Sequence, residues 1–463
     1  MKKFLSLVLI VIVLFTSFSV ISVSAAAEFE VEDGVLLSYN GNSTSVSIPS
    51  DVRYIADYAF EGNTKITSVK LNLVSAIGNK AFSGCTSLKT VTDDAYVTSC
   101  GAYAFENTPF FSNSSEIVLG TVLVKATAQG SFTVPSGVTS VAPYTCAGNT
   151  KITSLSVPDN VSEIGEGAFY NCTQLSSVSV SDKVASIGAF AFEGTPWLKN
   201  RTEDYVVAGS GILIDVNTTS ATVKIPDNVR YIGAGAFYKN TTLKSLSLHN
   251  KLSGIGMRAF AGCTALSSVE FPASLVMIDK EAFSGCTSLK SVIVPDTVSL
   301  LGESAFLGCK ALTTAEVYSD VPISSGLFAG CTSLGSVIIA SETKKIGDYA
   351  FNNCTKLQEL SVPDTVTFIS NTAFSGCDKL TVYCNDDSYM AKQSDVLGIN
   401  ASQIGDANLD GVVNIRDATQ IQKAIADIVT LSFSSRLRGD ADFSGVINVR
   451  DATRIQKNLA DLD

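Results

Sequence analysis

A phrase of 22 or 23 residues recurs through most of this chain of 463 residues and constrains the fold more than any other feature. Each copy carries an aromatic mark, usually the Phe of an Ala-Phe pair. The marks are Phe60, Phe82, Phe105, Phe169, Phe192, Phe237, Phe260, Phe283, Phe306, Phe328, Phe351 and Phe374, and Cys146 takes the same place in one further copy. A unit this short cannot bury its own apolar face, so its copies must stack. We therefore expect an α/β repeat solenoid of about thirteen coils, with short parallel strands around a core of Leu, Val, Ile and Phe.

Three residues after each mark, one slot accepts only Cys, Asn or Thr. The cysteines are Cys85, Cys172, Cys263, Cys286, Cys309, Cys331, Cys354 and Cys377, and the others are Asn63, Thr108, Asn149, Thr195 and Asn240. Such a slot predicts a small buried group that hydrogen-bonds to loop backbone. Because Asn and Thr form no disulfides, the pattern favours buried structural thiols over cross-links. Neighbouring coils still bring the sulfurs within disulfide range, so oxidation stays open.

Two steps between marks are longer than the rest, at 64 residues from Phe105 to Phe169 and 45 from Phe192 to Phe237. The first step contains the Cys146 coil. Segments at about 109–133 and 196–225 alternate apolar and polar residues around Gly and Asn turns, which predicts hairpin insertions. Trp197, the only tryptophan, stands at one insertion, where hairpin packing is favoured over ligand contact.

The repeat resembles the BspA-like class of leucine-rich repeat, most clearly as "IDKEAFSGCTSLKSVIVPDTV" (residues 278–298). The resemblance covers residues 28–400. It implies a curved solenoid that is secreted or on a bacterial surface and that binds diverse partners. The stretch "SYMAKQSDVLGI" (388–399) is expected to be a short helical end cap, which a solenoid needs.

The chain ends on an acidic phrase given twice, as "GDANLDGVVNIRDATQIQK" (405–423) and "GDADFSGVINVRDATRIQK" (439–457). Each copy contains a loop of twelve residues with oxygen ligands at the calcium positions and a Gly at the sixth. Hard oxygens without His or Cys select calcium over zinc or copper. We therefore predict two Ca²⁺ ions, held by Asp406, Asn408, Asp410, the Val412 carbonyl, Asn414 and Asp417, and by Asp440, Asp442, Ser444, the Val446 carbonyl, Asn448 and Asp451.

Both loops close with Asp where an EF-hand loop closes with Glu, and an apolar helix face with i, i+4 spacing follows each: Ile421 and Ile425, then Ile455 and Leu459. Residues 431–438 are expected to form a connecting helix. Duplicated loops of this kind resemble a type I dockerin over residues 404–463, an all-α calcium-binding domain. So small a domain needs the metal for stability.

The dockerin resemblance implies docking onto a cohesin of a scaffolding protein in a cellulosome or similar complex. The implied contacts are Ile415, Arg416, Thr419, Gln422 and Lys423 in one copy, and Val449, Arg450, Thr453, Gln456 and Lys457 in the other. Because the two faces are nearly identical, we expect two docking orientations related by about 180°. The contact pairs differ from those of the best-known dockerins, so the class of cohesin stays open.

Residues 1–27 are predicted to be an export signal, with Lys2 and Lys3, an apolar run from Phe4 and small residues near Ala25. The alternative is an uncleaved membrane anchor. The net charge of −11 argues against a nucleic-acid partner.

Catalytic motifs are absent from the sequence. The only histidine, His249, is interpreted as a strand-end residue, and no GxSxG, HExxH or P-loop appears. Tyr54, Tyr58, Tyr231 and Tyr238 are candidate surface aromatics. The sequence thus predicts a secreted, non-catalytic, dockerin-bearing protein whose solenoid, residues 28–400, recognises a protein or glycan. The alternatives are a tethered cell-surface adhesin and a solenoid with unrecognised glycan-hydrolase activity.

Overall fold

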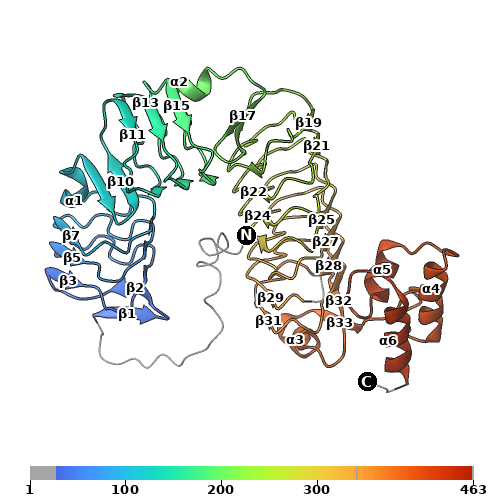
Figure 1. Ribbon diagram of the computed structural model, residues 1–463. Helices are drawn as coiled ribbons and strands as arrows, with labels where there is room; N and C mark the ends of the chain where they lie inside the picture. The colour runs from blue at the N-terminus through green and yellow to red at the C-terminus, as the bar shows by residue number, and fades with distance from the viewer. Residues whose placement is uncertain (1–27, 340–341, 461–463) are drawn as a thin grey trace. The chain divides into compact units, whose positions relative to one another are not determined.

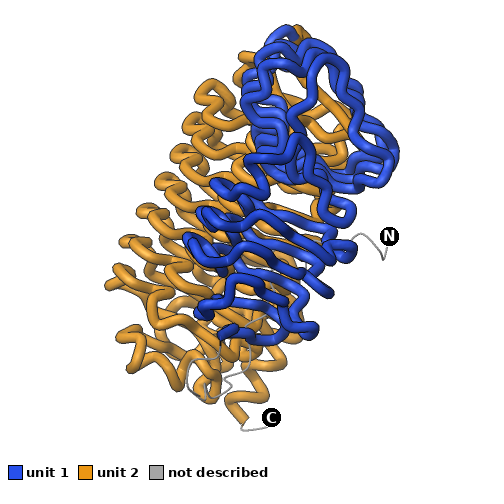
Figure 2. The backbone as a smooth tube through the Cα atoms, turned by 90° about the vertical axis from the view of Figure 1, so that its left-hand side faces the viewer, with its two compact units in different colours: residues 1–200 blue, residues 201–463 orange. Residues whose placement is uncertain are grey.

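The computed structural model describes residues 28–339 and 342–460 and divides into two compact units, Met1–Asn200 and Arg201–Asp463 (Figure 2). The expected export signal, residues 1–27, lies outside the described residues. Within the described part, no helix has both the length and the apolar character needed to cross a membrane.

Each regular coil supplies short strands to parallel sheets, so that strands of successive coils lie side by side within each unit (Figure 1). In the stretch Ser291–Val294 exposed and buried residues alternate, and Pro295 then ends the strand because it has no amide to donate. The strand pairs with the next one 23 positions on, Ser291 opposite Thr314. The predicted repeat solenoid is confirmed, and most of each coil outside its strands is turn.

The described residues of unit 1 form four sheets, in the orders β1-β2-β4-β6-β8, β3-β5-β7, β16-β14-β12-β10-β9 and β11-β13-β15. The elements are β1 (Phe29–Glu32), β2 (Val35–Tyr39), β3 (Ser45–Ser47), β4 (Tyr54–Ile55), β5 (Ser68–Lys70), β6 (Ala76–Ile77), β7 (Thr90–Thr92), β8 (Ser99–Cys100), α1 (Pro109–Ser112), β9 (Glu116–Leu119), β10 (Val122–Ala126), β11 (Gly130–Thr133), β12 (Ser140–Val141), β13 (Ile152–Val157), β14 (Glu163–Ile164), β15 (Ser177–Val180), β16 (Ser186–Ile187) and α2 (Pro196–Lys199).

Four more sheets lie in the described part of unit 2, in the orders β17-β18-β20-β22-β24-β26, β19-β21-β23, β25-β27-β28-β30-β32-β33 and β29-β31. The elements are β17 (Tyr205–Ala208), β18 (Ile212–Val216), β19 (Thr222–Lys224), β20 (Tyr231–Ile232), β21 (Ser245–Ser247), β22 (Gly254–Ile255), β23 (Ser268–Val269), β24 (Met277–Ile278), β25 (Ser291–Val294), β26 (Leu300–Leu301), β27 (Thr314–Val317), β28 (Ser336–Ile339), β29 (Lys345–Ile346), β30 (Glu359–Ser361), β31 (Phe368–Ile369), β32 (Thr381–Cys384), α3 (Tyr389–Leu397), β33 (Asn400–Gln403), α4 (Ile415–Ile425), α5 (Phe433–Gly439) and α6 (Val449–Leu459).

The phenylalanine marks form a ladder of stacked rings through the core. Neighbouring ring centroids lie between 4.7 Å, for Phe60 and Phe82, and 5.7 Å, for Phe328 and Phe351. All eleven cysteines are free and buried. In the slot beside the ladder, each thiol donates to a backbone carbonyl of the preceding coil, as Cys286 Sγ does to Phe260 O at 3.2 Å. The expected buried structural thiols are confirmed.

Three blocks of coils each begin with an antiparallel hairpin, β1–β2, β9–β10 or β17–β18, and the second strand of each hairpin joins a parallel sheet. Two of these hairpins lie in the long steps of the repeat. A short helix precedes each of them, and its aromatic residue covers the end of the ring ladder. Trp197 in α2 is buried and meets the Phe192 ring edge-on at 4.9 Å, so it is a packing residue.

The junction between the solenoid and the C-terminal module is a strand. β33 (Asn400–Gln403) pairs in parallel with β32, so the junction is the last strand of the solenoid sheet. The expected end cap is present just before it as α3, with Ser388 as N-cap and Gly398 in the left-handed region at φ +65°.

Candidate calcium-binding module

Two equivalent loops of the C-terminal module (residues 404–460) each lead into a helix through the same cap. Asn414 caps α4 and Asn448 caps α6, and each side chain accepts from a backbone amide of its own helix. Asp417 and Asp451, three residues further on, accept from the amides of these Asn residues at 2.8 Å. Because this Asn-x-x-Asp capping box is set locally, both loops reach the same geometry from the same sequence.

The second loop gathers three carboxylates around one point. Asp440, Asp442 and Asp451 each place an oxygen within 4.8 Å of the others, and Asp440 Oδ1 is buried without a hydrogen-bond partner. Burial, followed by the charge of Asp451, raises the pKa of Asp440 to about 7, and burial raises the pKa of Asp451 to about 6. Crowded buried carboxylates with an orphan oxygen fit a hard divalent cation that neutralises them.

The first loop holds its acids differently. Asp406 Oδ1 accepts from the Asp410 amide at 3.0 Å, while Asp406 Oδ2 accepts from the Gly411 amide at 3.2 Å and from Arg438 Nη1 at 3.0 Å. Burial raises the pKa of Asp417. Over residues 28–339 and 342–460, only the second loop brings three such acidic groups together. The Arg438 guanidinium therefore partly neutralises the first loop.

The other predicted ligands lie in the same two loops. The Val412 and Val446 carbonyls accept from the Asn414 and Asn448 side-chain amides at 2.9 and 2.8 Å. The remaining side chains are exposed or partly buried: Asn408, Asp410 and Asn414 in one loop, and Asp442, Ser444 and Asn448 in the other. Each loop thus collects its oxygen donors within one short stretch of chain.

The core of the module is small and symmetric. Ala407, Ala418 and Ile421 from one copy pack with Ala441, Ala452 and Ile455 from the other, and Val413 and Ile447 cover them. The i, i+4 partners Ile425 and Leu459 were expected on the same face as Ile421 and Ile455, but each is 46% exposed. They lie at the helix ends, beyond the reach of this core.

Helix α5 packs against the last coils of unit 2 and so attaches the module to the solenoid, a contact that the sequence did not predict. Arg436 Nη2 lies 3.0 Å from Glu316 Oε1, and Arg438 Nη2 lies 2.7 Å from Glu359 Oε1. An apolar cluster of Ile338, Tyr383, Ile404, Leu437 and Phe443 lies beside them. We call these contacts, with the Tyr318 hydroxyl donating to Gly445 O at 3.3 Å, the seat. Glu316 stands opposite Ile293 and Ile338 on the neighbouring strands, and that acid among apolar residues was the available signal.

The seat distinguishes the two copies. Phe443 in the second loop is 4% exposed and belongs to the seat, whereas its counterpart Leu409 is 40% exposed. The predicted partner residues are nevertheless exposed in both copies: Ile415, Arg416, Thr419, Gln422 and Lys423 on α4, and Val449, Arg450, Thr453, Gln456 and Lys457 on α6.

The candidate residues outside the module are His249 and four tyrosines. His249 Nε2 lies 2.9 Å from Pro226 O, and its Nδ1 accepts from the Lys251 amide at 3.1 Å, so both ring nitrogens are engaged in a turn. Among the tyrosines, Tyr58 and Tyr238 are exposed, at 54% and 40%, whereas Tyr54 and Tyr231 are partly buried.

Comparison with known families identifies both parts of the chain. The profile described as "BspA type Leucine rich repeat region (6 copies)" matches residues 35–123, 125–203, 216–334 and 321–391, which is more than half of the chain. The chain belongs to the BspA-type leucine-rich repeat family. A second profile, the dockerin type I domain, matches residues 404–460. Type I dockerins bind calcium and have cohesins as partners, and both families are typical of extracellular or surface proteins of bacteria.

The solved structures similar to this BspA-type protein include several bacterial leucine-rich repeat proteins. A leucine rich cell surface protein from Faecalibacterium prausnitzii is 25% identical, with 78% of this chain and 92% of that chain covered and a TM-score of 0.29. A Bacteroides ovatus leucine-rich repeat protein is 21% identical, with 80% and 94% covered and a TM-score of 0.34. The pneumococcal vaccine antigen PcpA is 19% identical, with 81% and 94% covered and a TM-score of 0.33. No match was found among curated proteins.

Proposed function

We propose that this protein is a secreted, non-catalytic adaptor of a cellulosome-like polysaccharide-degrading complex. Its dockerin docks onto a cohesin of a scaffolding protein, and its solenoid recognises a protein or glycan ligand. The observation that carries the proposal is the duplicated loop and helix with matching exposed faces, Arg416, Gln422 and Lys423 on α4 and Arg450, Gln456 and Lys457 on α6.

Two calcium ions, one for each loop, complete the proposed dockerin. Bound Ca²⁺ neutralises the crowded carboxylates of each loop and so turns binding energy into folding energy. The chain's own residues do the rest. The capping boxes orient Asp417 and Asp451 toward their loops, and the unpartnered Oδ1 of Asp440 supports an oxygen ligand in the second loop. The helices then start from fixed points, which places the exposed faces for docking.

The proposed cohesin partner binds the exposed face of either α4 or α6, so docking has two orientations. A binding assay with purified cohesins, in calcium and in EGTA, tests this on the full chain. We expect binding in calcium and none in EGTA. Triple alanine variants at Arg416, Gln422 and Lys423, or at Arg450, Gln456 and Lys457, should each keep binding, and their combination should lose it. Loss of binding in the first triple variant alone would reject two-orientation docking.

A further inference from the structure

The two loops of the dockerin contain the same number of acids but have different surroundings. The three acids of the first loop are Asp406, Asp410 and Asp417, and those of the second are Asp440, Asp442 and Asp451. Because the number of charged ligands sets calcium affinity in such loops, composition alone predicts two similar sites. The seat changes this balance, because it brings a cation to the first loop.

Arg438 bridges the first loop and the solenoid. Its Nη1 lies 3.0 Å from Asp406 Oδ2, and its Nη2 lies 2.7 Å from Glu359 Oε1 on β30. The Gly405 amide donates to Arg438 O at 2.6 Å, so the entries to the two loops lie side by side. The guanidinium also lies 4.7 Å from the centroid of the Tyr383 ring. These contacts hold the positive charge of Arg438 beside a predicted calcium ligand.

The second loop has a different residue at the equivalent place. Arg438 stands two residues before Asp440, and the residue two before Asp406 is Ile404. Ile404 is apolar and buried in the seat, so it supplies no charge to the second loop. Asp440 is 4% exposed, and its Oδ1 has no hydrogen-bond partner among the described residues. The second loop therefore keeps a buried carboxylate oxygen available for a bound cation.

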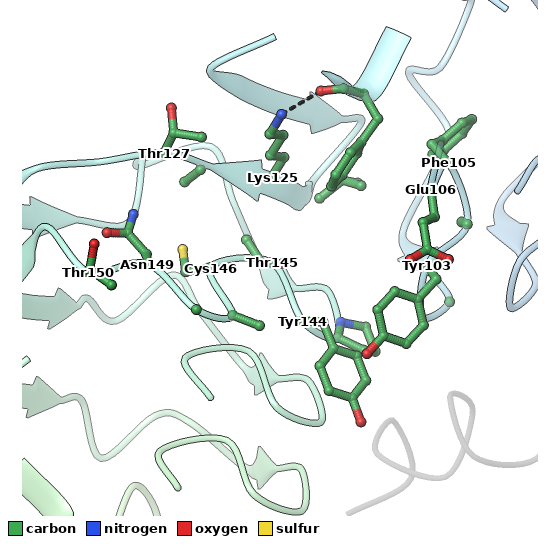
Figure 3. Close-up of a pocket in the computed structure, with 18 of the residues that line it drawn as sticks. Tyr103, Phe105, Glu106, Lys125, Thr127, Tyr144, Thr145, Cys146, Asn149 and Thr150 are labelled. Carbon is green, nitrogen blue, oxygen red and sulfur yellow. Dashed lines mark hydrogen bonds between the residues drawn. The ribbon is translucent and has the colours of Figure 1, made fainter. Parts of the chain in front are cut away.

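A partly buried cation in unit 1 shows a contrasting arrangement. Lys125 lies in the wall of a cavity of about 480 Å³, where its Nζ donates to Phe111 O at 2.5 Å (Figure 3). It also lies 4.5 Å from the centroid of the Phe111 ring. A carbonyl and an aromatic ring stabilise a cation without altering the charge of a carboxylate. Arg438 is instead held between two carboxylates, so its charge acts directly on the first loop.

We propose that the two calcium sites are unequal and fill in a fixed order, the second loop first, because Arg438 lowers the calcium affinity of the first loop. A cation beside Asp406 repels Ca²⁺ and offsets part of the negative charge that attracts the ion. Glu359 moderates this effect, because it shares the same guanidinium. The inference rests on the calcium binding proposed above, but it does not depend on docking onto a cohesin.

The order of filling bears on which docking face is ready. Asp417 closes the first loop and completes the capping box of α4, and Asp451 does the same for the second loop and α6. At calcium concentrations between the two dissociation constants, only α6 starts from a filled loop. The face of α6 is therefore ready for a cohesin at lower calcium than the face of α4.

Calorimetric titration of the full, calcium-depleted chain with CaCl₂ tests the order. We expect two binding steps whose dissociation constants differ by about tenfold or more. Asp410→Ala removes an exposed predicted ligand of the first loop, so it should abolish the weaker step and keep the tighter one. Two indistinguishable sites in the wild-type chain, or loss of the tighter step in Asp410→Ala, would overturn the inference.

Variants of the seat separate the charge of Arg438 from its structural role. Arg438→Gln removes the cation and should strengthen the weaker step about tenfold, whereas Arg438→Lys keeps the charge and should change that step much less. Glu359→Gln leaves Arg438 to Asp406 alone and should weaken the same step several-fold. Arg436→Gln is the matched control, because it breaks the ion pair of the seat with Glu316 and should leave both steps nearly unchanged.

The opposite directions expected for two of these variants make the test decisive. Arg438→Gln and Glu359→Gln break the same ion pair, so a purely structural role would move the affinity of the first loop in the same direction in both. Changes in the same direction would therefore overturn the inference. Should Arg438→Gln fail to fold, the titrations of the wild-type chain, Asp410→Ala and Glu359→Gln still decide it.

Cohesin binding provides a separate readout. At a calcium concentration between the two constants, the triple alanine variant of the α6 face should lose cohesin binding, while that of the α4 face should keep it. The reverse result would contradict the order of filling. Ordered calcium binding by a chain that binds no cohesin would support this inference and reject only the docking proposal.

Discussion

Replacing Gly445 with alanine should weaken the contacts of the seat between the dockerin and the solenoid, whereas replacing Gly411 with alanine should not. Both glycines hold the sixth position of their loops in the left-handed region, at φ +79° and +82°. A Cβ at Gly445 would lie 2.2 Å from Cε1 of Tyr318 in the solenoid, and a Cβ at Gly411 would meet nothing within 4 Å. The pair Gly445→Ala and Gly411→Ala therefore differs mainly in the seat.

The structure sets the expected difference. Each alanine costs about 1–2 kcal/mol for its left-handed backbone, and this cost cancels between the two variants. Each glycine amide also donates to the first Asp of its loop, Asp440 or Asp406, so the loops lose equivalent bonds if distorted. Only Gly445→Ala must displace the Tyr318 ring. Overpacking of this kind costs about 1–3 kcal/mol, which is the expected difference in the free energy of opening the seat.

Hydrogen exchange of the full chain in saturating calcium measures this opening. The amides of α5, which contacts β28 and β30, should exchange about 5- to 150-fold faster in Gly445→Ala than in Gly411→Ala. Replacing Tyr318 with Ala in the Gly445→Ala background should relieve the steric conflict and narrow the difference. Equal exchange in the two glycine variants would refute the seat.

Three further outcomes follow from the same contacts. Arg438→Ala leaves Glu359, whose side chain is 12% exposed, without its cation, and it should destabilise the seat by about 3 kcal/mol in urea unfolding, with partial rescue by Glu359→Gln. The pKa values of Asp440 and Asp451 are raised to about 7 and 6, so protons compete with calcium, and the Ca²⁺ affinity measured by calorimetry should fall more than tenfold from pH 7.5 to 5.5. Without calcium the pH dependence is reversed: these two carboxyl groups contribute less to the stability of the fold as pH rises from about 4 to 7, because they then ionise in the folded loop. Cys286→Ala removes a buried thiol and its hydrogen bond, and it should lower the free energy of unfolding by about 1–2 kcal/mol while an alanine at exposed Ser299 changes it little.

Features that repeat locally were predictable from the sequence. Every coil must present the same residues to its neighbours, so the phase of Phe283 and Cys286 already specifies a ring ladder with a thiol beside it. The dockerin loops were predictable for a similar reason. Asp440 and Asp451 lie within one loop and its capping box, where spacing along the chain fixes spacing in space.

Features that join distant parts of the chain were not predictable. Arg436 and Glu316 are 120 residues apart, and Arg438 and Glu359 are 79 apart, so no local period relates them.

Differential scanning calorimetry of the full chain, in calcium and in EGTA, tests most directly whether the metal creates the dockerin's shape. At a free calcium concentration of about 1,000 times the dissociation constant, binding stabilises a site by about 4 kcal/mol. We expect the transition that contains α4 and α6 to move to lower temperature or disappear in EGTA, while the transition of unit 1 stays in place. Identical heat-capacity profiles in the two buffers would contradict calcium-dependent folding and, with it, the docking role.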